Sequence, residues 1–546
     1  MERRKFIRNL TLGGAAGFAL GGIPVNVLAG NRALKRLAAA ADNENVLVFI
    51  QLHGGNDALN TLIPVSQYND YYNLRSNIAI PDYGTRKFIN VDSTVPEADQ
   101  VGLHPDMLSF KEMYDDGIVS IVQNVGYPDM NMSHFRGRDI VFMGGDAYDD
   151  YQSGWMGRFL DNVYPGYPDA YPNQDMPDPL GVELSGTLSL AFHRETGIPI
   201  GLNLGSPDQF YQLISSVGVD PPITLPDSHA GDELRYIMEF EKKSNQYAER
   251  LKNVYDAGSN SAVEYPEEYP YATQGNYSKN PLSGQLRLIA RMLKGGVKTR
   301  IFLCRIGGFD THGEQTVEYD STLGIHASLL YHLSTAVKAF FDDLKALGMD
   351  HKVMAMTFTE FGRRAYSNAS YGTDHGTSTP VFLFGPGLNP GIYGTNPDLN
   401  DLHNGNLKYN IDYRNIYTSI VQDWFGADNQ ALIETGFSEW VDTRLPLVGT
   451  TGVNDPSAGG SRGITYRIYP NPVRDQLNVR YQLEKQGTVK FTVLDTSGRV
   501  LMSISQQGYQ GDNQQTMNIS ELPEGLYTLS IVRGQVKTSS QFIKIR

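Results

Sequence analysis

The chain has 546 residues, a formal net charge of -14 and a hydrophobic content of 40%. This length allows one large domain of about 400 residues and a smaller module, each with its own core. The acidic balance argues against a nucleic-acid-binding protein, whose surface is normally basic. The single cysteine, Cys304, excludes an intramolecular disulfide, and its position in a predicted strand indicates a core residue.

Residues 1–30 have the pattern of an export signal. Arg3 and Arg4 precede an apolar stretch rich in Ala, Gly and Leu. A basic start followed by an apolar region predicts export, and paired arginines indicate the twin-arginine route. The glycines and the proline of the stretch disfavour a stable membrane-spanning helix. We therefore expect cleavage between Ala29 and Asp42, with an uncleaved anchor as the alternative.

Residues 45–445 show apolar strands that alternate with amphipathic helices. Short apolar runs bounded by glycine predict buried strands, and longer segments with apolar residues at helical spacing predict helices. Alternation over this length predicts an α/β domain with a mostly parallel sheet between helices. The expected strands are 46–50, 118–123, 300–306, 352–359 and 381–384, and the expected helices are 232–257, 282–294 and 322–347.

Side chains typical of metal sites stand at the ends of four predicted strands. Asp57 follows the first strand, Asp310 and His312 follow a later one, Glu360 follows the next, and His375 precedes the last. Because ligands of open α/β sheets bind beyond the carboxyl ends of strands, we expect one shared polar site. Histidine and carboxylate ligands together suit zinc, manganese or iron better than calcium. The sequence therefore predicts Asp57, Asp310, His312 and His375 as ligands of one or two divalent ions, zinc first and manganese second.

Each of these residues also has a simpler interpretation. Asp310 and His312 are two residues apart, so both could face one ion in an extended segment, but Asp310 could instead cap a helix. Glu360 is predicted to be catalytic as a general base, or to be a metal ligand. The alternative for Glu360 is an ion pair with Arg363 or Arg364.

Ser133 is the predicted nucleophile, and it lies downstream of strand 118–123. A metal can activate such a hydroxyl, although a serine at this place more often caps the following helix. Arg136 and Arg138, just beyond it, could hold an anionic group. Asp57 could equally belong to a tight strand-to-helix turn, and His375 could be a structural, hydrogen-bonded histidine.

Residues 449–463 form a linker of small residues, and residues 464–546 contain short strands separated by turns. The pattern predicts a small antiparallel β-sandwich, and a carbohydrate-binding module would share it. The module closely resembles the type A C-terminal sorting domain of the type IX secretion system of Bacteroidota. The resemblance implies that the type IX machinery is a partner, that the protein passes from the periplasm across the outer membrane, and that it is then released or attached to the cell surface. The matching motifs are Tyr469-Pro-Asn-Pro472, Val493-Leu-Asp-Thr-Ser-Gly-Arg499, Leu522-Pro-Glu-Gly-Leu-Tyr527 and Phe542-Ile-Lys-Ile-Arg546.

The large domain resembles the domain of unknown function 1501 family over about residues 45–445. This family is placed in the alkaline phosphatase and sulfatase superfamily. The resemblance implies a parallel sheet between helices and a site that commonly binds two metal ions and hydrolyses phosphate or sulfate esters. The matching motifs are His53-Gly-Gly-Asn-Asp57, Ser133-His-Phe135, Ser153-Gly-Trp-Met-Gly-Arg158, Gly308-Phe-Asp-Thr-His312, Thr359-Glu-Phe-Gly-Arg363 and Asp374-His-Gly376.

The resemblance also implies roles for single residues. Glu360-Phe361 stands where the superfamily has an Asp-His pair, so the second metal lacks a histidine, for which His53 is the candidate replacement. Ser133 matches the nucleophile position without its usual sequence context. The four positions that resemble metal ligands are Asp57, Asp310, His312 and His375.

The leading hypothesis is an exported, metal-dependent hydrolase of phosphate or sulfate esters, acting on a small-molecule or glycan ester. The mature protein would have no stable membrane span. The alternative is a non-catalytic surface binding or scaffold protein that keeps the fold with a degenerate metal site. A metal-free serine esterase that uses Ser133 ranks last, because no Gly-x-Ser-x-Gly motif surrounds that serine.

Overall fold

The computed structural model describes residues 43–184, 188–204, 247–271, 275–449 and most of 465–545, with a few short pieces elsewhere. The expected export signal lies outside the described residues, apart from the two-residue strands β1 (Ala19–Leu20) and β2 (Ile23–Pro24). The expected linker beyond Gly449 and residues 232–246 also lie outside them. Within the described residues, no helix combines the length and the apolar character that crossing a membrane requires.

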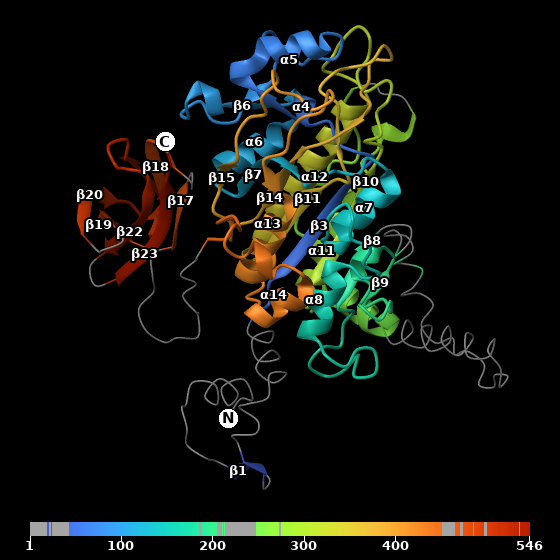
Figure 1. The fold of residues 1–546 in the computed structure, drawn as a ribbon. Helices are drawn as coiled ribbons and strands as arrows, with labels where there is room; N and C mark the ends of the chain where they lie inside the picture. The colour runs from blue at the N-terminus through green and yellow to red at the C-terminus, as the bar shows by residue number, and fades with distance from the viewer. Residues whose placement is uncertain are drawn as a thin grey trace, which may run out of the picture.

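A nine-stranded sheet forms the centre of the large α/β unit (Figure 1). The strand order is β15-β7-β14-β11-β3-β10-β8-β9, with β16 beside β7. β14 runs antiparallel to both of its neighbours, and all other pairs are parallel. The predicted mostly parallel α/β fold is therefore confirmed. The strands are β3 (Val46–His53), β7 (Val119–Gly126), β8 (Gly181–Leu184), β9 (Gly201–Asn203), β10 (Ile301–Gly307), β11 (Val353–Phe358), β14 (Thr379–Phe384), β15 (Gly391–Tyr393) and β16 (Ile411–Asp412).

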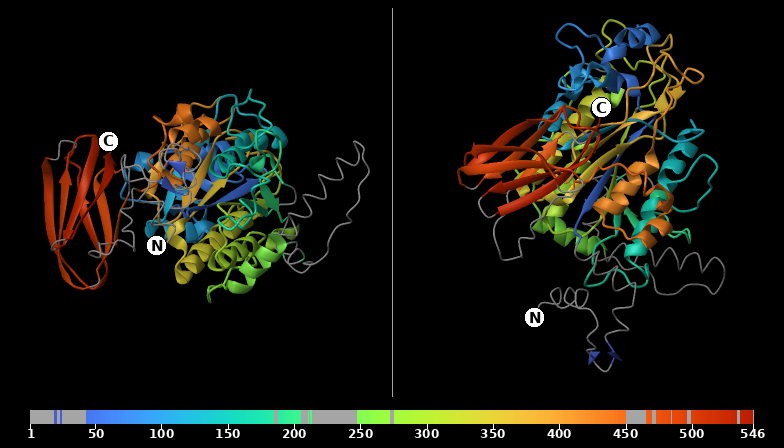
Figure 2. Two further views of the ribbon diagram at one scale, coloured as in Figure 1. Left: turned by 90° about the horizontal axis from the view of Figure 1, so that it is seen from below. Right: turned by 60° about the vertical axis from the view of Figure 1, so that its left-hand side comes forward.

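Helices cover both faces of this sheet, as the end-on view in Figure 2 shows. Alternate residues of a strand point to opposite faces, so Val48 and Ile50 of β3 join one core while Leu47 and Phe49 join the other. The first core also contains α6 (Leu108–Asp115), α11 (Ser283–Lys294) and α12 (Ile325–Leu347). The second contains α7 (His134–Met143), α8 (Trp155–Val163), α13 (Tyr413–Ser419) and α14 (Asn429–Thr435).

The strand directions bring five chain segments to one edge of the sheet. β7, β11 and β10 all run in the direction of β3, so their carboxyl ends meet at the edge where β3 ends. Because β14 runs the opposite way, its beginning lies at this same edge. The segment that precedes β14 is thereby placed beside the segments that follow the other four strands. This edge is where the predicted site residues lie.

A smaller layer lies beyond this edge. It contains a three-stranded antiparallel sheet in the order β4-β6-β5, together with two helices. A two-stranded pair, β12 (Gly362–Arg363) with β13 (His375–Gly376), joins the segments after β11 and before β14. The remaining elements are α4 (Ala58–Thr61), β4 (Leu62–Pro64), α5 (Tyr68–Arg75), β5 (Ile89–Asn90) and β6 (Val101–Leu103).

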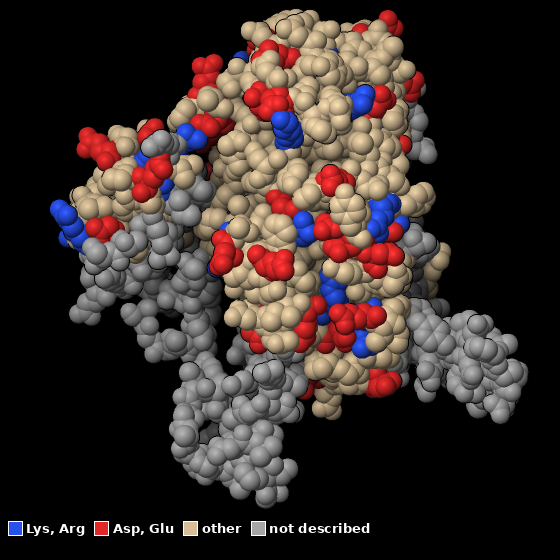
Figure 3. Space-filling model, viewed as in Figure 1, with Lys and Arg blue, Asp and Glu red and all other residues tan. Residues whose placement is uncertain are grey.

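The C-terminal unit consists of two antiparallel sheets, β17-β18-β21 and β20-β19-β22-β23. Both contribute to one separate core, for example through Val479, Phe491 and Leu529, so the predicted β-sandwich is confirmed. In Figure 3, acidic and basic side chains are interspersed over the visible face, with acidic groups the more frequent. The strands are β17 (Thr465–Tyr469), β18 (Gln476–Leu483), β19 (Gly487–Leu494), β20 (Val500–Gly508), β21 (Gly511–Asn518), β22 (Gly525–Arg533) and β23 (Val536–Lys544).

Candidate metal centre

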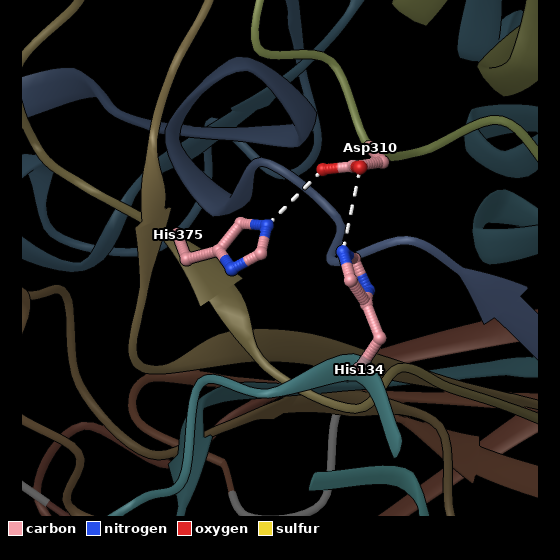
Figure 4. Close-up of side chains that lie close together, drawn as sticks. All are labelled: His134, Asp310 and His375. Atoms are coloured by element: carbon pink, nitrogen blue, oxygen red, sulfur yellow. Dashed lines mark hydrogen bonds and ion pairs between the residues drawn. The ribbon is translucent and has the colours of Figure 1, made fainter. Parts of the chain in front are cut away.

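Three histidines converge on one carboxylate, Asp310, at this edge of the sheet. Nε2 of His375 and Nε2 of His312 lie 3.1 and 3.3 Å from Oδ1 of Asp310. Nε2 of His134 lies 3.3 Å from Oδ2 (Figure 4). Asp310 follows β10, His375 belongs to β13, and His134 begins α7 after β7. We call His134, His312 and His375 the histidine trio.

Each histidine of the trio has its other ring nitrogen against an acceptor. This arrangement is typical of metal-binding histidines, because the outer acceptor fixes the tautomer and the ring orientation. Among the described residues, His134, Asp310 and His375 form the one group of three whose possible ligand atoms all lie within 4.8 Å of one another. The outer contacts are His134 Nδ1 to Glu360 Oε1 at 3.0 Å, His312 Nδ1 to Asp374 Oδ1 at 3.2 Å, and His375 Nδ1 to the Met132 carbonyl at 2.9 Å.

Asp310 is held ionised by its neighbours. Burial opposes its ionisation, but hydrogen bonds from Arg363 and His375 outweigh this and lower the pKa of Asp310 to about 2. The buried Arg363 donates to Oδ1 of Asp310 at 2.7 Å and also to nearby backbone carbonyls, including those of Gly55 and Phe309. The predicted contact between Asp310 and His312 is therefore present, and Asp310 has an arginine partner as well.

The donor set fits a single divalent transition-metal ion. Imidazole nitrogens and a carboxylate oxygen are the ligands that zinc and manganese accept. Burial lowers the pKa of His375, which favours the neutral imidazole that a metal needs. About half of the Asp310 and His312 side chains remain exposed, at 46% and 49%, so a substrate can reach the group from solvent.

Glu360 holds His134 in place. Its side chain is fully buried, and Oε1 accepts the Gly54 amide at 2.8 Å as well as facing His134. The hydrogen bond with Glu360 raises the pKa of His134. Helix α7 can pack close to the segment of Glu360 because Gly137 has no side chain. A Cβ at Gly137 would lie 3.1 Å from the Glu360 carbonyl oxygen. Glu360 makes no ion pair with Arg363 or Arg364, which was the alternative for this residue, and its contacts give it a positioning role toward His134. The catalytic role of Glu360 stays a prediction.

Asp57 is not part of this group, contrary to the prediction. Its carboxylate is fully buried and accepts two bonds from Nη1 of Arg75, at 2.8 and 2.6 Å, and one from Gln315 Nε2 at 2.5 Å. It also caps α4 by accepting from the Leu59 amide. Burial opposes ionisation, but Arg75 outweighs it and lowers the pKa of Asp57. The alternative of a structural strand-to-helix turn is therefore the one observed.

Phe361 stands at the position where the sequence resemblance implies a histidine for a second metal ion, and its ring forms an apolar wall there. Its ring centroid lies 4.4 Å from that of His375 and 5.0 Å from that of His134. His53, the candidate replacement, stacks on His134 with ring centroids 6.1 Å apart and does not join the group around Asp310. The described residues thus provide ligands for one ion at this edge.

Ser133 stands immediately before His134, at the N-cap position of α7. Its side chain is exposed and makes no capping hydrogen bond. His134 was not among the predicted site residues, because it lies well beyond the end of the predicted strand 118–123, whereas Asp310 and Glu360 closely follow theirs. The sequence signal that marks it is the motif Ser133-His-Phe135, in which a histidine follows the predicted nucleophile.

The fold and the site define an α/β protein with a histidine–carboxylate group at its strand ends. Residues 228–436 match the family described as protein of unknown function (DUF1501), and residues 467–545 match the secretion system C-terminal sorting domain. These matches agree with the resemblances drawn from the sequence motifs, over residues 228–436 of the expected 45–445 and over most of the expected sorting domain. The sorting domain indicates secretion or attachment at the cell surface, with handling by the type IX system.

Similar solved structures include a Vibrio parahaemolyticus protein in the alkaline phosphatase superfamily, with 10% identity, coverage of 84% of this chain and 85% of that one, and a TM-score of 0.34. A Bacteroides thetaiotaomicron protein described with glycosaminoglycan metabolism has 9% identity, 84% and 89% coverage, and a TM-score of 0.30. Alkaline phosphatase from the Antarctic bacterium TAB5 has 12% identity, 72% and 99% coverage, and a TM-score of 0.25. A search of curated proteins gave no match.

Proposed function

We propose that this protein is a secreted or cell-surface hydrolase of phosphate or sulfate esters that uses one divalent metal ion. The observation that carries the proposal is the convergence of three Nε2 atoms on Asp310, with every outer ring nitrogen held by an acceptor. Residues 45–445 would form the catalytic unit, and residues 464–546 the module that directs export. The ligands would be His134, Asp310 and His375, with His312 beside them through its contact with Asp310, and zinc or manganese would suit this set.

A metal ion bound there would polarise the ester and lower the pKa of the attacking hydroxyl. The chain's own residues would prepare the site for this. Arg363 keeps Asp310 ionised, and Glu360 fixes the ring of His134. Ser133 supplies an exposed hydroxyl adjacent in sequence to His134, which supports it as the nucleophile. Attack of the Ser133 oxygen on the phosphorus or sulfur would break the bond to the alcohol, which leaves with a proton, and would form a serine ester. Water would then hydrolyse that serine ester, freeing the phosphate or sulfate and restoring the Ser133 hydroxyl.

Metal analysis of the mature protein, followed by a screen of phosphate and sulfate esters, tests this proposal. We expect close to one divalent ion per chain and turnover of at least one ester class. Removing the metal with a chelator should abolish turnover, and adding zinc or manganese should restore it. Metal-free protein with full activity, or no metal uptake at all, would contradict the proposal.

A non-catalytic binding or scaffold protein is the second candidate, and two observations favour it. The positive charge of Arg363 already balances the negative charge of Asp310 through a 2.7 Å hydrogen bond. Phe361 stands beside His375 at the position where a metal-binding histidine was expected. Such a protein would bind one ion for stability or ligand contact alone. Stoichiometric metal without hydrolysis of any ester in the screen would decide in its favour.

A further inference from the structure

One face of α7 points at the sheet next to the histidine trio. His134, Arg138 and Phe142 are spaced four residues apart, so they lie on the same side of the helix. The ring of His134 stacks on His53 at the end of β3, and the ring of Phe142 lies 5.4 Å from that of Phe358 in β11. Arg138 lies midway between these two contacts and therefore faces the sheet.

The sheet under Arg138 is polar at this point. Gln51 precedes His53 by two residues in β3, so both side chains project from the same face. Arg305 of β10 is the register partner of Gln51, and neighbouring residues of parallel strands share a face. Farther back along this face, Leu47 and Phe49 belong to the hydrophobic core. We call Gln51, Arg138 and Arg305 the donor cluster.

The donor cluster has hydrogen-bond donors that lack acceptors. Gln51 is 3% exposed, and its buried Nε2 has no partner. Nε of Arg138 is likewise buried and unpartnered, while its Nη2 is 3.4 Å from Oδ1 of the adjacent Asp139 and its guanidinium lies 5.9 Å from the ring centre of Phe135. In the described part of the chain, the guanidinium of Arg305 makes no hydrogen bond or ion pair. Arg305 is half-buried, whereas Nε2 of Gln51 and Nε of Arg138 are buried donors. Buried donors without acceptors are costly, so these two atoms call for an acceptor from outside.

The positive charges of the donor cluster also favour the binding of an anion. Burial, followed by the charge of Arg138, lowers the pKa of Arg305, although Glu360 and Glu183 partly offset the repulsion. Two arginines are therefore placed close enough to repel each other. A bound anion would remove this repulsion and accept from the free donors.

We propose that Gln51, Arg138 and Arg305 bind the oxyanion of the substrate, a phosphate or sulfate group, beside the metal centre. This inference rests on the proposed function and adds the residues that recognise the acidic part of the ester. Guanidinium groups bind tetrahedral oxyanions through paired N–H donors, and a glutamine amide adds two more. Because the cluster offers donors, it suits a fully deprotonated oxyanion better than a neutral ester.

Calorimetric titration with inorganic phosphate and with inorganic sulfate tests this inference on the full chain. We expect binding of at least one anion, weakened tenfold or more in both Arg138→Gln and Arg305→Gln. Arg287→Gln is the matched control, because Arg287 is exposed on α11 at the opposite face of the sheet. Metal content and melting temperature should stay near wild type in all three variants.

The variant Gln51→Met tests the part that Gln51 plays in anion binding. Methionine has a similar size and removes the unmet donor, so it should preserve the melting temperature while weakening anion binding. A lower melting temperature with unchanged affinity would instead assign Gln51 to packing and overturn its part in the cluster. Wild-type protein that binds neither anion, or equal affinity in wild type, Arg138→Gln and Arg305→Gln, would overturn the whole inference.

The outcomes also separate this inference from the proposed function. Ester hydrolysis with unchanged KM and kcat in both arginine variants would leave the hydrolase intact and remove the donor cluster from it. Anion binding that depends on both arginines in a chain that takes up no metal would support the cluster and contradict the hydrolase.

Discussion

Oε1 of Glu360 lies 3.0 Å from Nδ1 of His134, and this fully buried carboxylate leaves Nε2 of the same ring free to face Asp310. A negative outer partner makes a histidine a better metal ligand. We predict that Glu360→Gln, which keeps the size and an accepting oxygen but loses the charge, lowers metal affinity by about 10–100-fold. Competition with a chelator measures it. Glu112→Gln, an exposed substitution on α6, is the control, and equal affinities in the two variants would contradict the positioning role.

The histidine trio should determine metal content and stability together. His134→Ala and His375→Ala are each expected to lose most of the bound metal and to melt at a lower temperature. A ligand that binds only the folded state stabilises it by about 2.7 kcal/mol when present at 100 times its Kd. Elemental analysis and thermal unfolding, with and without chelator, provide the measurement. The exposed His351→Ala should match wild type in both, and a chelator should lower the melting temperature of wild type but not of the trio variants.

Ser133→Ala separates a nucleophile from a helix cap. A capping serine loses about 0.5–2 kcal/mol of stability on substitution by alanine. The Ser133 hydroxyl makes no capping bond, so we expect an unchanged melting temperature, unchanged metal content and loss of ester hydrolysis. Ser76→Ala, a substitution at another exposed serine, is the control and should leave ester hydrolysis unchanged. Full turnover in Ser133→Ala would transfer the nucleophile's role to water.

Asp57 should affect stability and leave the metal centre intact. Asp57→Asn would leave the fully buried Arg75 without its charged partner, and removal of one member of a buried pair costs about 3–5 kcal/mol. Denaturant unfolding measures the loss. Asp115→Asn, which breaks the exposed pair with Lys111, should cost at most about 1 kcal/mol. A folded fraction of Asp57→Asn with normal metal content would agree with this assignment, whereas loss of metal per folded molecule would restore Asp57 as a ligand.

Acid should destabilise the protein through His326. Burial lowers the pKa of this histidine from 6.5 to about 4 in the folded chain. Between these values the unfolded chain binds more protons, so stability is greatest above pH 6.5 and falls as the pH decreases toward 4. At 1.36 kcal/mol per unit, the loss is at most roughly 3 kcal/mol. Unfolding free energy measured against pH should show a shallower slope for His326→Gln than for wild type, whereas the exposed His351→Gln should keep the wild-type slope.

Much of the fold could be predicted from the sequence, because buried strands and amphipathic helices have clear patterns. The runs at 300–306 and 352–359 became β10 and β11, and the helices expected at 282–294 and 322–347 became α11 and α12. The direction of β14 could not be predicted, because an apolar run looks the same whichever way it pairs. That direction explains how His375, which precedes its strand, meets residues that follow theirs.

The site was predicted less completely. Asp310, His312 and His375 come together as the strand-end pattern indicated, but the same pattern also selected Asp57. Asp57 follows a strand as a metal ligand would, and only the fold places Arg75 and Gln315 against its carboxylate. Pairings between side chains from distant segments leave no local sequence pattern. For the same reason, the contact of Glu360 with His134 could not be foreseen.

The antiparallel placement of β14 has a kinetic consequence. His134, Asp310 and His375 belong to segments that become neighbours only after β7, β10, β11 and β14 have paired with the rest of the sheet. Closing such long loops is slow and must come before their contacts can form. Only Asp310 and His312 are neighbours in the sequence, so an ion would meet at most two of the candidate ligands in the nascent chain and would not nucleate folding as the ion of a zinc finger does. Refolding in the presence of a chelator should proceed at the same rate as refolding with metal, and the ion should instead slow unfolding.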